Sequence, residues 1–344
     1  MSIVSAEAGR VPSMDDETRT WQQAMQDAIR RTDDLLRLVG LESKAGLCDP
    51  SFPLFVPREF AARIVPGDAR DPLLRQVLPT IDERTPGDGF VPDPVGDHAA
   101  RTDGGLLQKY EGRALWVLTG VCPVHCRYCF RQHYDYRPHS AHQRRVLGEP
   151  FGARGLAWLR AQSSVEEVIF SGGDPLSLED DKLDRLLQQL DAVSHLRRLR
   201  IHTRMPVMIP QRITADLISA FRKSRLTVFF VVHINHVQEI DAAVQRGLGK
   251  LIDAGIPVLN QAVLLAGVND HPEALVSLSR RLIDLRVLPY YLHQLDRVKG
   301  ATHFEVPVEE GRRLMRELRR RLPGYAVPRY VREVPGELNK RVLA

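Results

Sequence analysis

Three cysteines stand close together in this 344-residue sequence: Cys122, Cys126 and Cys129. Gaps of three and then two residues allow one loop to wrap three thiolates around a single iron–sulfur cubane. Three ligands leave the fourth iron of a [4Fe–4S] cluster without a protein ligand, so that this iron can bind a substrate or cofactor. The alternative is a closed structural zinc site, in which the missing ligand comes from Cys48, His125 or His133.

The cysteines follow an apolar run that predicts a β-strand, and five further runs of this kind alternate with helical periodicity. The six predicted strands cover residues 114–120, 165–173, 196–204, 226–234, 257–265 and 288–295. This pattern favours an α/β fold with a parallel sheet, whose chemistry lies at the C-terminal ends of the strands. Six units are too few for a complete eight-unit barrel, so we expect a partial (βα)6 TIM-like barrel, with a doubly wound sheet as the alternative.

The remaining elements complete a three-part organisation. Ser177 is predicted to cap the helix after the second strand, and Thr214 to cap a later one. Before residue 100 we expect a helix over 21–39 and a short one over 71–78, and the Pro-, Gly- and Asp-rich stretch 85–105 indicates a linker. The predicted parts are a helical N-terminal region with this linker (1–105), the barrel (106–325) and a short C-terminal segment (326–344).

The composition is that of a soluble globular protein, with 43% hydrophobic and 26% charged residues. The net charge of +5 is spread over apparent helices among acidic residues and does not indicate nucleic-acid binding. We find neither an apolar signal core at the start nor an apolar run that could span a bilayer. Four cysteines without a disulfide pattern suit a reducing compartment, so we expect a cytoplasmic protein.

The pattern Cys-x-x-x-Cys-x-aromatic-Cys, with Tyr128 as the aromatic residue, resembles the radical S-adenosylmethionine (SAM) superfamily. The resemblance implies a cluster that binds SAM at its open iron and reduces it to release a 5′-deoxyadenosyl radical. The sequence Ser-Gly-Gly-Asp-Pro, with Gly172, Gly173 and Asp174, is similar to the superfamily's SAM-contacting glycine motif. Without the cysteines, a plain strand-to-helix turn would be the better interpretation.

Four further segments resemble the lysine 2,3-aminomutase family: residues 109–113, 203–206, 210–214 and 264–270. The better match is the short branch that makes β-lysine for modification of elongation factor P, since the sequence ends four residues after Lys340. This resemblance implies conversion of L-α-lysine to β-lysine with pyridoxal phosphate, which Lys340 would bind covalently. Tyr110 and Arg113 match residues that contact pyridoxal phosphate in the family, and Lys109 stands where longer members have arginine.

The resemblance also implies a substrate site. Arg131 matches the arginine that pairs with the substrate carboxylate, and Asp270 and Glu333 match acidic residues that hold the distal ammonium. The implied partners are L-lysine, an electron donor of flavodoxin or ferredoxin type, and the ligase that attaches β-lysine to elongation factor P. The side chains at other strand ends are expected to be buried and hydrogen-bonded: His233, Asn235, His236 and His293.

Two alternatives stay open from the sequence. The first is a radical SAM enzyme that acts on another substrate without pyridoxal phosphate, in which Lys340 is only a residue of the chain end. The second is a zinc-stabilised binding module without enzymatic activity.

Overall fold

A nine-stranded sheet forms the centre of the computed structural model, which describes residues 19–41, 47, 51–137 and 151–344. The strands lie side by side in chain order, and all neighbours from β2 to β8 are parallel. Antiparallel β1 and β9 form the two edges. The strands are β1 (Leu106–Tyr110), β2 (Arg113–Thr119), β3 (Glu167–Gly172), β4 (Arg198–Thr203), β5 (Thr227–His233), β6 (Val258–Leu264), β7 (Leu288–Gln294), β8 (Arg329–Arg332) and β9 (Arg341–Val342).

This strand order confirms the partial barrel. A doubly wound sheet would reverse its strand order at one point, and no such reversal occurs along β1 to β9. The six predicted strands correspond to β2 through β7, with ends within two residues of the prediction. β5 shows the clearest signal, because a strand buried on both faces is almost continuously apolar, as in its run Phe230, Val231 and Val232, whose exposure is 0%.

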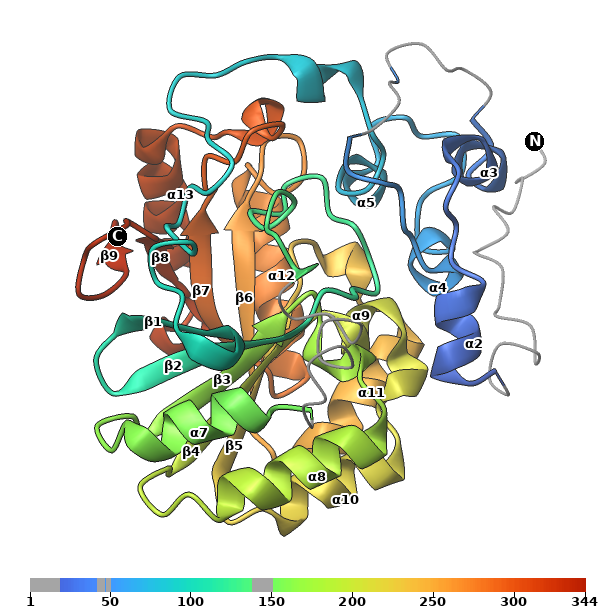
Figure 1. Cartoon of the computed structure of the whole chain (residues 1–344). Helices are drawn as coiled ribbons and strands as arrows, with labels where there is room; N and C mark the ends of the chain where they lie inside the picture. The colour runs from blue at the N-terminus through green and yellow to red at the C-terminus, as the bar shows by residue number, and fades with distance from the viewer. Residues whose placement is uncertain (1–18, 42–46, 48–50, 138–150) are drawn as a thin grey trace, which may run out of the picture.

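Helices lie between successive parallel strands and cover the outer face of the sheet (Figure 1). Thr214 caps α10 as predicted, because its hydroxyl accepts a hydrogen bond from the Leu217 amide. The prediction for Ser177 was wrong: it ends a short 3-10 turn, and its hydroxyl donates to the carbonyl of Val121. The α-helices are α7 (Ala153–Ala161), α8 (Asp180–Asp191), α9 (Met205–Met208), α10 (Ala215–Lys223), α11 (Ala242–Asp253), α12 (Pro272–Asp284) and α13 (Val308–Arg321).

The N-terminal helices gather on one side of the barrel (Figure 1). They are α2 (Trp21–Gln26), α3 (Thr32–Leu38), α4 (Arg58–Ala61) and α5 (Pro72–Arg75). The predicted single helix over 21–39 was therefore wrong: Ile29 separates α2 from α3 because its backbone pairs with Val56 in a β-bridge. The short helix expected over 71–78 is α5, which Asp71 caps.

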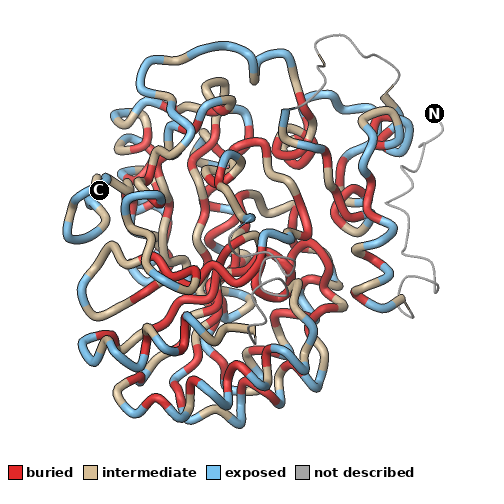
Figure 2. The backbone as a smooth tube through the Cα atoms, in the orientation of Figure 1, coloured by how far each residue is buried: buried red, intermediate tan, exposed pale blue. Residues whose placement is uncertain are grey.

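The stretch 85–105 is packed against the barrel. Val91 forms a β-bridge with Val298, and Val95 and Asp97 are buried. The core likewise continues from the N-terminal helices into the barrel, since Trp21 and Phe60 belong to the same hydrophobic cluster as residues of the barrel strands. Figure 2 shows buried segments both in the N-terminal helices and in the barrel. A helix long and apolar enough to cross a bilayer, about 20 residues, is not found among the described residues.

Candidate active site at the barrel mouth

The three cysteines lie in the loop after β2, where the parallel strands end. The N-terminal region holds this loop: the His125 amide donates to the Phe55 carbonyl (2.9 Å) and the Arg127 amide to the Gln76 carbonyl (2.9 Å). The Arg127 guanidinium is fully buried and pairs with Glu83 at 2.5 Å. The loop therefore depends on segments 44 to 75 residues away in the sequence.

The thiols of the three cysteines are free and act on one another electrostatically. Burial raises the pKa of Cys122 well above its ordinary value, and the charges of Asp174 and Cys126 raise it further. Burial and the charge of Cys126 raise the pKa of Cys129 to about 11. Three neighbouring thiolates in this loop thus require a compensating cation, which suits a bound metal centre.

The donor set fits a cubane better than one metal ion. In the described part of the chain, no three His, Cys, Asp or Glu side chains are grouped so as to hold one ion. A cubane does not require three ligands around one ion, because each thiolate binds a different iron. Of the ligands considered for zinc, Cys48 lies outside the described residues, and His125 and His133 each direct a ring nitrogen at a backbone carbonyl.

The glycine turn after β3 packs against the start of the cysteine loop. Gly172 has φ +128°, and a Cβ there would lie 2.4 Å from the Thr119 carbonyl oxygen. A Cβ on Gly173 would lie 2.3 Å from the carbonyl oxygen of Val121. Any side chain would therefore displace the backbone that leads into the cysteines. Contact of this turn with SAM stays a prediction.

Asp174 connects this turn to the end of β4. It is 1% exposed, and its carboxylate accepts hydrogen bonds from the Thr203 hydroxyl (2.8 Å) and the Arg204 amide (2.7 Å). Burial raises the pKa of its carboxyl to about 6, against these hydrogen bonds, which lower it. The role that the structure supports for Asp174 is to join the loops after β3 and β4.

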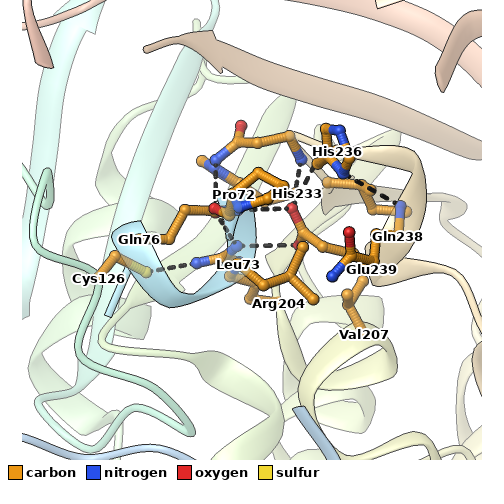
Figure 3. Close-up of polar contacts among 12 residues, drawn as sticks. Pro72, Leu73, Gln76, Cys126, Arg204, Val207, His233, His236, Gln238 and Glu239 are labelled. Atoms are coloured by element: carbon orange, nitrogen blue, oxygen red, sulfur yellow. Dashed lines mark hydrogen bonds and ion pairs between the residues drawn. The ribbon is translucent and has the colours of Figure 1, made fainter. Parts of the chain in front are cut away.

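A buried polar network that the sequence did not predict lies beside Cys126 (Figure 3). Arg204, at the end of β4, donates to Cys126 Sγ, to Gln76 Oε1 and to Glu239 Oε2. Asn235 is buried and hydrogen-bonded as expected, and it contacts Gln76 through its amide group (3.0 Å). No local sequence signal marks this network, because its members come from α5, the cysteine loop and the ends of β4 and β5.

The three histidines at the strand ends are half-buried and not fully buried as expected. His233 is half-buried and lies 3.1 Å from the Tyr128 hydroxyl. His236 is half-buried and accepts a hydrogen bond from the Gln238 amide. His293 is also half-buried, and burial followed by the charge of Lys340 lowers its pKa well below the ordinary value. Burial also lowers the pKa of His233 and His236, so all three rings are neutral near pH 7.

A second group of charges surrounds Lys340 at the same mouth. Lys340 Nζ pairs with Glu333, whose other oxygen accepts a hydrogen bond from the Tyr110 hydroxyl at 2.6 Å. β9 holds Lys340 in place, since Arg341 and Val342 pair with β8. Burial alone would raise the pKa of Glu333, but Lys340 and Tyr110 lower it below the ordinary value. Lys340 is thus held beside Glu333 and Tyr110 at the barrel mouth.

Arg131 joins this group through Asp97. Its Nε lies 2.7 Å from Asp97 Oδ2, and Lys109 Nζ lies 2.6 Å from Asp97 Oδ1. Lys109 also approaches Glu333, at 3.9 Å. The structure therefore brings together four of the predicted residues, Arg131, Lys109, Glu333 and Lys340, with Asp97 as a bridge that the sequence did not predict. Arg113 lies next to them, 4.6 Å from the Tyr110 ring centroid.

Asp296, which the sequence analysis did not single out, is the further carboxylate of this group. It follows β7, and burial raises its pKa to about 7, while the charge of Lys340 lowers it. The other charges that act on it are those of Glu333, Lys109 and Asp97. Asp270 follows β6 and is half-buried, and no ion pair joins it to Lys340 or Glu333 in the described part of the chain. Asp296 is therefore the carboxylate after β7 whose charge interacts with Lys340, and a role of Asp270 in substrate binding stays a prediction.

Comparison with known proteins agrees with the fold and the cysteine loop. The family model "Radical SAM superfamily" matches residues 116–278. Together with the open parallel barrel and the three cysteines at its mouth, this match places the chain in the radical SAM class. Membership of this class implies a [4Fe–4S] cluster and SAM.

The curated relatives are more specific. The L-lysine 2,3-aminomutase of Escherichia coli is 42% identical, over 96% of this chain and 95% of that protein. The enzyme of the same name from Haemophilus influenzae is 39% identical, over 95% and 96%. That from Clostridium subterminale is 31% identical, over 94% of this chain and 77% of that protein. The chain belongs to the lysine 2,3-aminomutase family.

Proposed function

We propose that the protein converts L-α-lysine to β-lysine, with SAM at a [4Fe–4S] cluster and with pyridoxal phosphate. The observation that carries this proposal is that the barrel mouth holds opposite charges in two places. Arg131 offers a positive charge beside Asp97, and Glu333 and Asp296 offer carboxylates that interact with Lys340. A lysine substrate has a carboxylate and a distal ammonium, which need such partners. An electron donor of flavodoxin or ferredoxin type would reduce the cluster.

The roles follow from the contacts. Cys122, Cys126 and Cys129 would hold the cluster, and its open iron would bind SAM. Arg131 would bind the substrate carboxylate, since Asp97 (2.7 Å) and the Ser171 hydroxyl (3.0 Å) hold its guanidinium in one orientation. Glu333 and Asp296 would hold the distal ammonium of the substrate, with Asp296 in the place predicted for Asp270. Glu333 pairs with the ammonium of Lys340, and the charges of both residues act on Asp296.

Four residues around Glu333 suit pyridoxal phosphate. Lys340 supplies the amine, Arg113 and Lys109 supply cations for a phosphate or phenolate, and Tyr110 supplies an aromatic ring. When bound, pyridoxal phosphate supplies an electron-accepting ring and holds the migrating nitrogen. Borohydride reduction followed by peptide mapping tests this part. A pyridoxyl adduct on Lys340 is expected, and an unmodified Lys340 in protein reconstituted with pyridoxal phosphate would favour a radical SAM enzyme without this cofactor.

The activity is tested by anaerobic incubation of reconstituted protein with L-lysine, SAM, dithionite and pyridoxal phosphate, followed by chiral amino-acid analysis. We expect a β-lysine isomer and 5′-deoxyadenosine. Formation of 5′-deoxyadenosine without any β-isomer would point to another substrate. Stoichiometric zinc without iron or sulfide in anaerobically purified protein would favour the zinc-stabilised module and refute the proposal.

We also propose that the β-lysine is used by a ligase that modifies elongation factor P. The resemblance to the short branch of the family supports this use. Intact-mass analysis of elongation factor P, incubated with the ligase and the product of this enzyme, tests it. The expected result is a mass increase of one lysyl residue that requires this enzyme when only α-lysine is supplied.

A further inference from the structure

A buried arginine lies against one of the three cysteines. Arg204 is 6% exposed, and its Nη1 lies 2.6 Å from Cys126 Sγ. Figure 3 shows this contact and the two that Nη2 makes, with Gln76 Oε1 at 2.7 Å and Glu239 Oε2 at 3.0 Å. One guanidinium thus links the cysteine loop to helix α5 and to the turn after β5.

The partners of Arg204 are themselves held in place. Gln76 and Glu239 are both 0% exposed. Glu239 Oε1 accepts hydrogen bonds from the backbone amides of Asn235 (2.9 Å) and His236 (3.0 Å), and the Gln76 amide donates to it as well (3.2 Å). The guanidinium could not turn away from Cys126 without breaking hydrogen bonds in a site closed to water, which is costly.

The contact distinguishes Cys126 from its two neighbours. Among the described residues, Cys126 is the one cysteine of the three whose sulfur accepts a hydrogen bond from a charged side chain. A charge-assisted hydrogen bond is about twice as strong as a neutral one. When a cluster takes up an electron, the negative charge on its sulfur ligands increases, so donors to those sulfurs favour the reduced form.

We propose that Arg204 is a positioning residue for the metal centre, which holds the Cys126 sulfur in place and raises the reduction potential of the cluster. Glu239 limits this effect, because its carboxylate neutralises part of the guanidinium charge. The inference rests on the cluster that family membership implies and goes beyond the proposed aminomutase activity. It predicts opposite effects for the loss of Arg204 and the loss of the Glu239 charge.

The test is a redox titration of reconstituted protein, followed by electron paramagnetic resonance, without lysine or SAM. For Arg204→Gln we expect the ratio of reduced to oxidised cluster, measured at the wild-type midpoint potential, to fall about tenfold, equal to 59 mV for one electron. Arg212→Gln is the matched control. Arg212 is likewise buried, with 0% exposure, and it donates to the carbonyls of Leu176 and Leu178 and not to a cysteine.

Glu239→Gln should raise the same ratio, because the charge of Arg204 is then less neutralised. A midpoint potential of Arg204→Gln equal to that of the wild type or of Arg212→Gln would overturn the proposal. If Arg204→Gln does not retain iron, Glu239→Gln decides, and a potential at or below the wild-type value refutes the inference. Failure of the aminomutase proposal would be distinguishable, since it would leave these potentials as predicted and give no β-lysine.

Discussion

Replacing Asp296 by asparagine should make the protein more stable at alkaline pH and impair binding of the substrate. Burial raises the pKa of this carboxyl from 3.8 to about 7. Between these values the folded protein keeps a proton that the unfolded chain releases, so the free energy of unfolding falls as the pH rises. An asparagine carries no such proton, and Asp296→Asn removes this pH dependence.

The size of the effect follows from the pKa. Each pKa unit corresponds to 1.36 kcal/mol, which sets an upper bound of about 4 kcal/mol. Between pH 5 and pH 8 only the two units from pH 5 to about 7 contribute, which limits the change to about 2.7 kcal/mol. Because Asp296 is partly exposed to solvent, we expect roughly 1 to 2 kcal/mol. The advantage of Asp296→Asn in the free energy of unfolding should therefore grow by that amount between pH 5 and pH 8, measured by urea denaturation of the protein without cofactors.

The same substitution should weaken lysine binding. Loss of one buried partner of a charge pair costs about 2 kcal/mol or more, so KM for lysine should rise roughly thirtyfold or more. Asp270→Asn is the matched comparison, and we expect it to change neither the pH dependence of stability nor KM to this extent. An Asp296→Asn protein with wild-type KM, or with the same stability advantage at pH 5 and pH 8, would refute the reasoning.

Three other substitutions test the rest of the site. Cys126→Ala should lower the iron content per chain and abolish formation of 5′-deoxyadenosine, measured by chromatography, and undiminished cleavage of SAM would contradict the cluster. Gly173→Ala places a Cβ 2.3 Å from the Val121 carbonyl oxygen and should cost about 1–3 kcal/mol in unfolding free energy, whereas Gly249→Ala, with no atom within 4 Å, should be neutral or stabilising. Asp97→Asn should lower the free energy of unfolding by about 3–5 kcal/mol, and this loss should stay constant from pH 5 to pH 8. Burial alone would raise the pKa of Asp97, but its two cationic partners lower the pKa to about 2. The stabilisation by the Asp97 carboxylate is therefore lost only as the pH falls toward that value. Urea denaturation measures both of the latter effects, and a difference for Asp97→Asn that changes with pH in this range would contradict the assignment.

The strands that the sequence predicted are the longer ones, with six or seven residues each. β2, β3 and β5 form near-continuous buried runs, whereas β4 and β6 alternate buried and half-buried positions. β8, with the sequence Arg-Tyr-Val-Arg, and the two-residue β9 are too short to show a period. These two strands form only through tertiary pairing, because β8 pairs with β7 and β9 pairs with β8.

The same distinction applies to the site. The cysteine loop is local in sequence, so a metal centre could be predicted from its spacing, whereas the role of the glycine turn was implied only by the family resemblance. The choice between Asp270 and Asp296 could not be predicted from spacing, because each follows a parallel strand and both ends lie at the same mouth. The fold favours Asp296, because β7 pairs with β8, which leads into Glu333, while β6 lies one strand further away. The loop that carries Asp296 is therefore the nearer one.

The N-terminal region belongs to the metal site, although its sequence carries no recognisable chemistry. Gln76 accepts hydrogen bonds from the Arg127 amide and from Arg204, and Glu83 neutralises the Arg127 guanidinium. Without these partners two buried arginines beside the cysteines would lose a partner each, at a cost of several kcal/mol. The division at residue 105 thus separates two sequence patterns, while the cysteine loop needs residues from both sides of it.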